Sequence, residues 1–204
     1  MVPAVLHVYH REGAGRPLRI LWTLEEVGIP YEITRMSREE GSSEEHRRRH
    51  PLARVPVLES DHGNIFESAA MCMHIGDLHP ESGLMPALDT HERGLVYQWA
   101  VFAPAEMEPS LFAASKRAAE QDAERAASAR GRFDTAAAAV EDALDGRAYL
   151  VGDALTVADV LVATALLFTV RAGFFEDLSP ALQGYVGAMR ERPAFQRAFE
   201  RTFG

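Results

Sequence analysis

The chain has 204 residues, of which 47% are hydrophobic and 25% charged, a composition typical of one or two globular domains and not of a disordered chain. Its formal net charge of −9 argues against general binding to nucleic acid or to an anionic membrane. The single cysteine, Cys72, excludes an intrachain disulfide and fits a reducing compartment. No signal-peptide pattern opens the chain, and the most apolar stretch, 160–170, is too short to span a bilayer, so we expect a cytoplasmic protein.

The first quarter of the sequence alternates strand and helix signals. Residues 5–9 are rich in β-formers and predict a strand, followed by a loop at 13–15. Residues 17–27 predict a helix, because Pro17 suits a first helical turn and leucines recur at helical spacing. Residues 31–36 predict the second strand.

The next segment adds a hairpin and a helix. The polar residues 37–49 predict a loop with some helix, and 55–58 predict a third strand. A turn at 61–64 then leads back into Ile65 and Phe66. Ser68 has the character of an N-cap for a helix that runs to about Leu78. This order predicts a small mixed sheet with helices on its faces.

Beyond Pro80 the sequence becomes helical. Residues 91–112 carry an aromatic and aliphatic stripe, with Pro104 as a kink or break, and 116–144 predict one long alanine-rich helix. Thr156 and Asp159 have the spacing of a capping box that begins the most buried helix.

The change in character near Pro80 divides the chain. We expect an α+β domain over 1–80, a linker over 81–90 and an all-helical domain over 91–204.

Pro56 has two interpretations. A proline at the start of a strand removes one ladder donor and is typical of an edge strand. Alternatively, a cis peptide between Val55 and Pro56 would turn the backbone of Val55 outward, so that it could pair with a peptide-like ligand as an extra strand.

The pair Glu67-Ser68 also has two interpretations. One is a plain N-cap beside an exposed glutamate. In the other, Ser68 and the helix N-terminus bind a carboxylate while Glu67 pairs with an ammonium group, an arrangement that suits an α-amino acid head group.

Several motifs in both halves together resemble the cytosolic glutathione transferase superfamily, in its bacterial, serine-class-like form. They occur in the correct order over nearly the whole length. They are the segments 19–28 (RILWTLEEVG), 50–58 (HPLARVPVL), 66–70 (FESAA), 97–99 (YQW) and 149–159 (YLVGDALTVAD).

The resemblance implies a thioredoxin-like N-terminal domain and an all-helical C-terminal domain, usually in a homodimer. It implies that Val55, before a cis Pro56, bonds the cysteinyl backbone of glutathione, and that Glu67 and Ser68 hold the γ-glutamyl head. Arg54 is the candidate for the glycyl carboxylate. Glutathione would be a co-substrate, with no resident cofactor, and the helical domain would supply an apolar pocket for a small electrophile.

The first loop departs from the family pattern. Conjugation needs a glutathione thiolate, usually stabilised by a hydroxyl or thiol after the first strand. In relatives with Ser-Arg before this helix, the serine would align with Gly15, which has no side-chain donor. Three alternatives remain open. In the first, backbone N–H groups near Gly15 and Arg16, together with the Arg16 charge, stabilise the thiolate. In the second, Tyr9 or His10 supplies the donor, and in the third the protein binds glutathione but transfers it poorly.

The leading hypothesis is therefore a glutathione transferase that acts on small hydrophobic electrophiles in detoxification. The alternatives are a non-catalytic ligand-binding or interaction module of the same fold, and a glutathione-dependent peroxidase or isomerase. The loop lacks Cys-x-x-Cys, so a dithiol mechanism is excluded. We expect Cys72 to be a buried hydrophobe, and we expect no metal site, because His46 and His50 have no third ligand at matching spacing.

Overall fold

The computed structural model describes residues 5–204, which form two compact units. The first contains the chain up to Ser82 together with residues 193–204, and the second contains residues 83–192. We predicted that the last helix belongs to the helical domain over 91–204. In the structure it packs on the first helix of the chain and belongs to the first unit.

The first unit is built on a four-stranded sheet of order β2-β1-β3-β4. β1 and β2 are parallel, whereas β3 runs antiparallel to both β1 and β4. β3 and β4 form the predicted hairpin. The strands are β1 (Leu6–Arg11), β2 (Tyr31–Met36), β3 (Val57–Ser60) and β4 (Gly63–Ile65).

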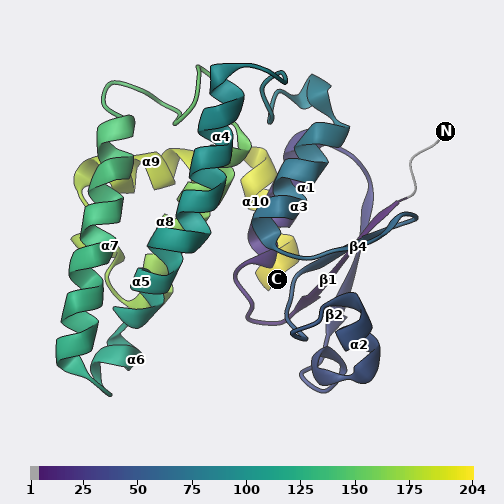
Figure 1. Cartoon of the computed structure of the whole chain (residues 1–204), viewed down its shortest axis with the longest axis horizontal. Helices are drawn as coiled ribbons and strands as arrows, with labels where there is room; N and C mark the ends of the chain where they lie inside the picture. Colours follow the sequence, from purple (N-terminus) through teal and green to yellow (C-terminus); the bar gives the residue numbers. More distant parts are fainter. Residues whose placement is uncertain (1–4) are drawn as a thin grey trace. The chain divides into compact units, whose positions relative to one another are not determined.

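The helices of the first unit complete a thioredoxin-like α+β arrangement. α1 packs against both α3 and α10 (Figure 1), and the Trp22 ring meets Phe195 edge-on at 5.1 Å. α1 has Pro17 in its first turn and ends at the left-handed Gly28, as predicted. The helices are α1 (Pro17–Val27), η1 (Glu40–Ser42), α2 (Glu44–Arg49), α3 (Ser68–Leu78), η2 (Pro80–Ser82) and α10 (Pro193–Phe203).

The second unit is entirely helical in the described residues. α8 is its centre, with contacts to α4, α5 and α9, and almost all of its side chains are buried. These two units confirm the predicted fold class. The helices are α4 (His91–Phe102), the π-helical η3 (Ala103–Met107), α5 (Glu108–Ala113), α6 (Lys116–Ala119), α7 (Ala123–Ala143), α8 (Val157–Ala172), η4 (Phe175–Asp177) and α9 (Pro180–Arg190).

Among the described residues, no helix combines the length and the apolar character that a bilayer span requires.

Two predicted helices are interrupted in the structure. Residues 116–144 form α6 and α7 and not one helix, because Asp122 leaves helical geometry and caps α7 by accepting from the Arg125 N–H at 3.0 Å. The kink predicted at Pro104 takes the form of the π-helical segment η3, a common way for a helix to absorb an irregular turn.

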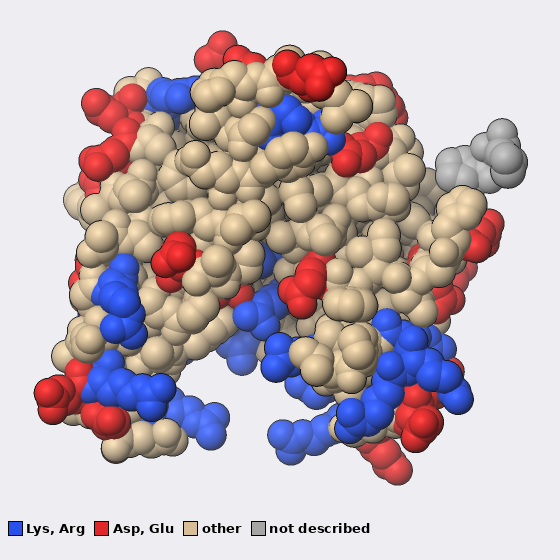
Figure 2. Space-filling view, viewed as in Figure 1, with Lys and Arg blue, Asp and Glu red and all other residues tan. Residues whose placement is uncertain are grey.

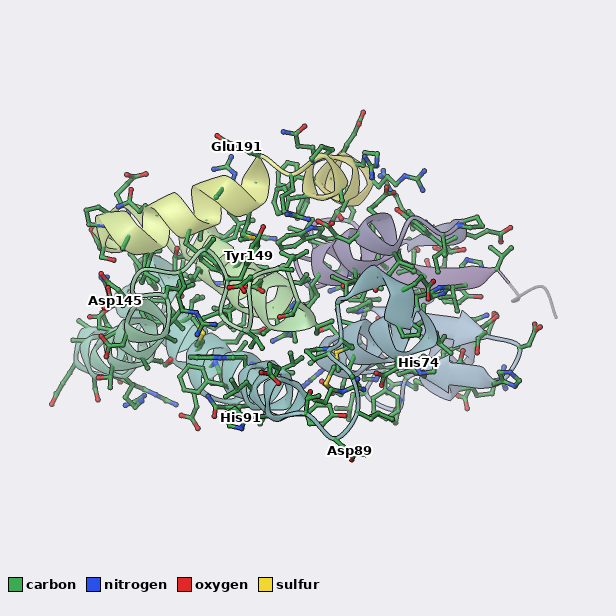
Figure 3. The ribbon with its side chains drawn as sticks, turned by 90° about the horizontal axis from the view of Figure 1, so that it is seen from above. His74, Asp89, His91, Asp145, Tyr149 and Glu191 are labelled. Carbon is green, nitrogen blue, oxygen red and sulfur yellow. The ribbon has the colours of Figure 1, made fainter. Side chains whose placement is uncertain are left out.

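The capping box at the start of α8 is confirmed, and it belongs to a larger buried network. The Asp159 carboxylate accepts hydrogen bonds from the backbone N–H groups of Leu150 and Thr156, both at 2.9 Å. It also accepts from the Thr156 hydroxyl at 3.1 Å and from the Tyr185 hydroxyl at 2.9 Å. The network fixes the loop that follows Tyr149 (Figure 3) onto α8 and α9.

Candidate functional site

The loop before β3 presents an unpaired stretch of backbone. The peptide between Val55 and Pro56 is cis, as the second interpretation of Pro56 requires. Neither the N–H nor the C=O of Val55 has a hydrogen-bond partner within the described part of the chain. A backbone with both groups open can pair with an extended peptide.

Two buried histidines shape this loop. The Nε2–H of His46, in α2, donates to the Arg54 carbonyl at 2.8 Å, which fixes the backbone directly before Val55. His50 accepts from the Leu52 N–H at 3.1 Å through Nδ1. The Arg54 side chain is exposed. The pair that we considered as a metal-ligand pair is thus structural, and the described residues contain no cluster of three or more metal-ligating side chains.

His50 also joins the two halves of the predicted site. Its ring lies 4.9 Å from that of Phe66, and burial lowers its pKa while nearby Glu67 raises it. The neighbouring His46 ring and the Arg54 guanidinium also lower this pKa. The structure therefore brings the loop 50–54 together with the segment 66–67.

Glu67 and Ser68 begin α3, but not in the predicted positions. Glu67 is the N-cap, with a left-handed φ of 71°, and Ser68 is the first helical residue. A non-glycine residue in this region is strained, and such residues cluster at ligand-binding positions. The first N–H groups of α3 thus point out of the helix, where the dipole favours an anion.

Arg19 is a member of this site that the sequence did not reveal. It is fully buried in α1, and its Nη1 donates to the Ser68 hydroxyl at 3.2 Å. In the sequence it resembles one more charge on an amphipathic helix, and its partner lies 49 positions away. A buried guanidinium behind Ser68 orients that hydroxyl and adds positive charge at the start of α3.

The loop between β1 and α1 offers a backbone donor. The Gly15 carbonyl accepts from the Leu18 N–H at 3.1 Å, while the Gly15 N–H has no partner among the residues described. Arg16 is the N-cap of α1 and is exposed, and Pro17 contributes no N–H. An N–H next to a helix N-terminus can stabilise a negative charge such as a thiolate.

His10 is less suited to act as the donor. Its side chain is fully buried, and its Nδ1–H donates to the Arg11 carbonyl at 3.3 Å. Burial lowers the pKa of His10, so the ring is neutral at pH 7 and Nε2 carries no proton. A neutral ring with this tautomer cannot donate through Nε2 to a thiolate.

Replacing His10 by glutamine should reduce the loss of stability on acidification. Because the folded pKa of His10 lies below its unfolded value, the unfolded state takes up the proton first and stability falls as the pH drops through about 6.5. We expect the unfolding free energy, from urea melts at pH 7.5 and 5.5, to decline less in His10→Gln than in the wild type. His62→Gln, at an exposed position, is the control, and an equal decline in both variants would contradict the assignment.

Tyr9 and Cys72 are core residues. Tyr9 is buried with Met36 and Val57, and burial raises the pKa of its phenol. Burial also raises the pKa of the Cys72 thiol to about 11, so it is a poor nucleophile, and the side chain is fully buried as predicted.

A basic patch lies beside the Arg54 loop. Figure 2 shows basic side chains gathered over α2, where Arg47 and Arg48 are exposed. Arg49 instead pairs with Glu45 at 2.7 Å and with Glu59 at 3.5 Å, so it is held on the sheet. The exposed arginines give this region a local positive charge in a net acidic chain, which favours the approach of an anion.

Comparisons with known proteins identify both halves of the chain. Residues 4–77 match the family model "Glutathione S-transferase, N-terminal domain", and residues 102–193 match "Glutathione S-transferase, C-terminal domain". Glutathione S-transferase hmp2 of Hypomyces subiculosus is 29% identical over 196 residues, covering 88% of this chain and 92% of the relative.

Two further relatives match this chain over very different fractions of their own length. Elongation factor 1-gamma of Trypanosoma cruzi is 32% identical over 148 residues, which cover 72% of this chain but only 36% of that longer protein. A sphingomonad glutathione S-transferase solved in complex with glutathione has a TM-score of 0.82 and 26% identity, and the match covers 96% of this chain and 98% of that one.

Proposed function

The chain belongs to the cytosolic glutathione S-transferase superfamily, and from this premise we propose that it binds glutathione and conjugates it to small hydrophobic electrophiles. The observation that carries the proposal is the open backbone of Val55 next to the start of α3. Glutathione is a tripeptide with a free α-amino acid head group, so it needs a backbone to pair with and a site for that head group.

Each part of glutathione has a counterpart in the first unit. The N–H and C=O of Val55, held before Pro56, pair with the cysteinyl backbone. The γ-glutamyl carboxylate binds the Ser68 hydroxyl and the first N–H groups of α3, while Glu67 pairs with the ammonium group. Exposed Arg54 binds the glycyl carboxylate.

The backbone at the start of α1 stabilises the thiolate in this proposal. The Gly15 N–H and the helix N-terminus supply the hydrogen bond and the dipole, and the exposed Arg16 guanidinium adds positive charge. None of these groups is a side-chain hydroxyl or thiol that donates a hydrogen bond to the glutathione sulfur. Turnover is therefore slower than in a relative with a serine at this position.

Replacing Ser68 by alanine should weaken glutathione binding by about tenfold or more, because a hydrogen bond to a charged group typically contributes about 1.5–3 kcal/mol. Calorimetric titration with glutathione measures the effect directly. Ser42→Ala, at an exposed serine outside the site, should bind like the wild type.

Two results of this titration would refute different parts of the proposal. Failure of the wild type to bind millimolar glutathione would remove the proposed function itself. Unchanged affinity in Ser68→Ala would leave glutathione binding intact but show that the γ-glutamyl head does not bind at the start of α3.

A second candidate is a glutathione-binding module without transferase turnover. Gly15 is the specific observation in its favour, since the loop provides no hydroxyl or thiol. Glutathione binding without conjugation of a chloronitrobenzene would support this second function.

We propose a cytoplasmic homodimer as the working form. Tyr97 and Val101 lie one turn apart on α4 and are 43% and 63% exposed, so this helix presents two neighbouring apolar side chains at its surface. A two-fold contact between copies of the chain would cover them.

A further inference from the structure

A tight turn precedes Val55 in the chain and sets where its open backbone lies. The Ala53 N–H donates to the His50 carbonyl at 2.8 Å, which closes a β-turn with Pro51 at its second position. Ala53 leaves the turn with a left-handed φ of 47°. A residue with a Cβ is disfavoured in this conformation, so the turn needs support from its surroundings.

The His50 side chain supplies that support. Its Nδ1 accepts a hydrogen bond from the Leu52 N–H at 3.1 Å, inside the same turn. A backbone N–H can only donate, so Nδ1 carries no proton and the ring is neutral. The residue is only 4% exposed, and its ring packs on Phe66. His50 therefore connects the turn before Val55 with the segment that leads into α3.

Protonation of this ring is incompatible with the turn. The added proton would go to Nδ1, which would then face the Leu52 N–H as one donor against another. The Leu52 N–H would lose its acceptor, and the ring would hold a charge in a buried position. Both changes cost free energy, so the charged ring is accommodated only when the turn opens and the ring reaches water.

The groups around His50 act on its protonation in the same sense. Burial lowers the pKa of the ring, Glu67 at the start of α3 raises it, and His46 in α2 and Arg54 in the loop lower it, with a lowered pKa as the net result. In an open loop the solvated ring takes up a proton near its ordinary pKa of 6.5. The closed turn is therefore fully favoured at pH 7.5 and is lost as the pH falls below about 6.5.

The hydrogen bond of His46 does not depend on protonation in this way. Its Nε2–H donates to the Arg54 carbonyl at 2.8 Å, and that nitrogen carries a proton in the charged ring as well as in the neutral one. The bond is therefore available in both states. The acceptor that a proton removes from this loop belongs to His50.

We propose that His50, in its neutral form, is a positioning residue for glutathione, and that its protonation opens the turn at 50–53 and lowers the affinity for glutathione. The inference rests on the proposed binding of glutathione at Val55 and adds a regulation of that site by pH. His50 itself contacts no part of the ligand in this scheme. It acts through the backbone of Val55 and through Phe66, which precedes Glu67.

The test is a calorimetric titration of the full chain with S-hexylglutathione at pH 7.5, 6.5, 5.5 and 5.0. This thioether has no thiol, so ionisation of a bound sulfur cannot contribute to the pH dependence. We expect the wild-type Kd to rise about fivefold between pH 7.5 and pH 5.0, because one proton competes with the ligand.

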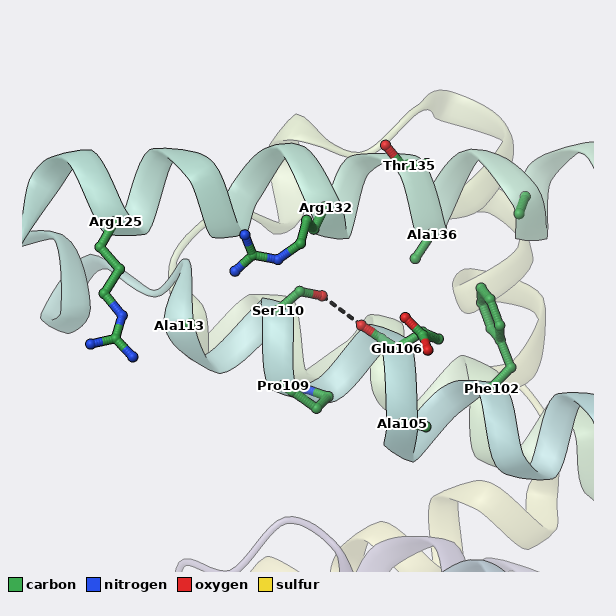
Figure 4. Close-up of a pocket in the computed structure, with 11 residues that line it drawn as sticks. Phe102, Ala105, Glu106, Pro109, Ser110, Ala113, Arg125, Arg132, Thr135 and Ala136 are labelled. Atoms are coloured by element: carbon green, nitrogen blue, oxygen red, sulfur yellow. Dashed lines mark hydrogen bonds between the residues drawn. The ribbon is translucent and has the colours of Figure 1, made fainter.

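The hexyl chain of the probe does not introduce a pH dependence of its own. A cavity lies between α7 and α5 in the helical unit (Figure 4), and an alkyl chain could enter it. None of its described lining residues is a histidine, the side chain that ordinarily titrates between pH 5 and 8. A change of affinity over this range therefore reports on the loop and not on the cavity.

His50→Asn separates positioning from charge. The asparagine side-chain oxygen is as many bonds from Cα as Nδ1 is, so it can accept from the Leu52 N–H, and it does not titrate. We expect this variant to bind within about twofold of the wild type at pH 7.5 and to keep that affinity at pH 5.0. His50→Ala removes the acceptor and should bind about tenfold more weakly at every pH.

His62→Gln is the matched control, because it removes an exposed histidine from the turn between β3 and β4, outside the site. It should keep the pH dependence of the wild type.

The outcomes separate this inference from the proposed function. A wild type that does not bind S-hexylglutathione at pH 7.5 would overturn both. Binding at pH 7.5 with a Kd that stays constant down to pH 5.0 would overturn only the role of His50. So would an equal rise of Kd in the wild type and in His50→Asn, because general acid unfolding weakens both proteins alike.

Discussion

Replacing Gly15 by serine should raise kcat/KM for conjugation of glutathione to 1-chloro-2,4-dinitrobenzene by about a hundredfold. One well-placed donor to a developing or stabilised anion typically changes a rate by about 10² to 10³. Gly15 lies in the turn that leads into α1, and its open N–H already points to this position as an anion site. A serine hydroxyl would add a second donor.

The backbone at Gly15 permits the substitution. The described glycines with a positive φ do not include it, so a residue with a Cβ meets no penalty from a left-handed conformation. Gly15→Ala is the matched control, because it adds the Cβ without the hydroxyl. We expect the alanine variant to remain within about threefold of the wild type, a difference below 1 kcal/mol.

The pH profile distinguishes thiolate stabilisation from better substrate binding. If the serine lowers the pKa of the bound thiol, the rise of kcat with pH shifts to lower pH in Gly15→Ser. Equal rates for the serine and alanine variants would show that Gly15 does not lie at the sulfur. Turnover in Gly15→Ser with none in the wild type would establish the second candidate function, a binding protein that lacks only its donor.

The secondary structure around the site was predicted from the sequence because strands, turns and helices depend on local signals. The strand, the turn and the helix around residues 55–78 follow from proline, glycine and periodicity, which act within a few positions. The order of these elements then indicated the fold. The cis peptide before Pro56 was one of two interpretations, and nothing local could decide between them.

Contacts between distant residues account for what the sequence missed. The role of Arg19 was not predicted, because its partner Ser68 comes from another helix. Ser68 was expected as the N-cap, but Glu67 takes that position in a strained conformation that propensities disfavour. The alanine-rich pattern also concealed the break between α6 and α7, since helix propensity at 116–144 outweighs the single capping signal of Asp122.

Replacing Asp159 by alanine should lower the unfolding free energy of the chain by about 4 kcal/mol. The carboxylate accepts four hydrogen bonds, from two backbone N–H groups and two hydroxyls, and it is fully buried. Each buried donor left without a partner costs about 1–3 kcal/mol, although a Thr156 or Tyr185 hydroxyl can rotate toward another acceptor. Losses of this size are confined to a few mechanisms, and a broken buried network is one of them.

Asp153→Ala provides the control for this measurement. Asp153 lies in the same loop but is exposed, so its loss should change the unfolding free energy by less than about 0.5 kcal/mol. Urea melts of both variants, followed by far-UV circular dichroism, give the comparison. The loop that Asp159 holds is hydrogen-bonded to the first turn of α8, the central helix of the second unit, so we expect a cooperative loss over that unit and not local fraying. A change below about 1 kcal/mol in Asp159→Ala would mean that hydrophobic packing of α8 alone positions the loop.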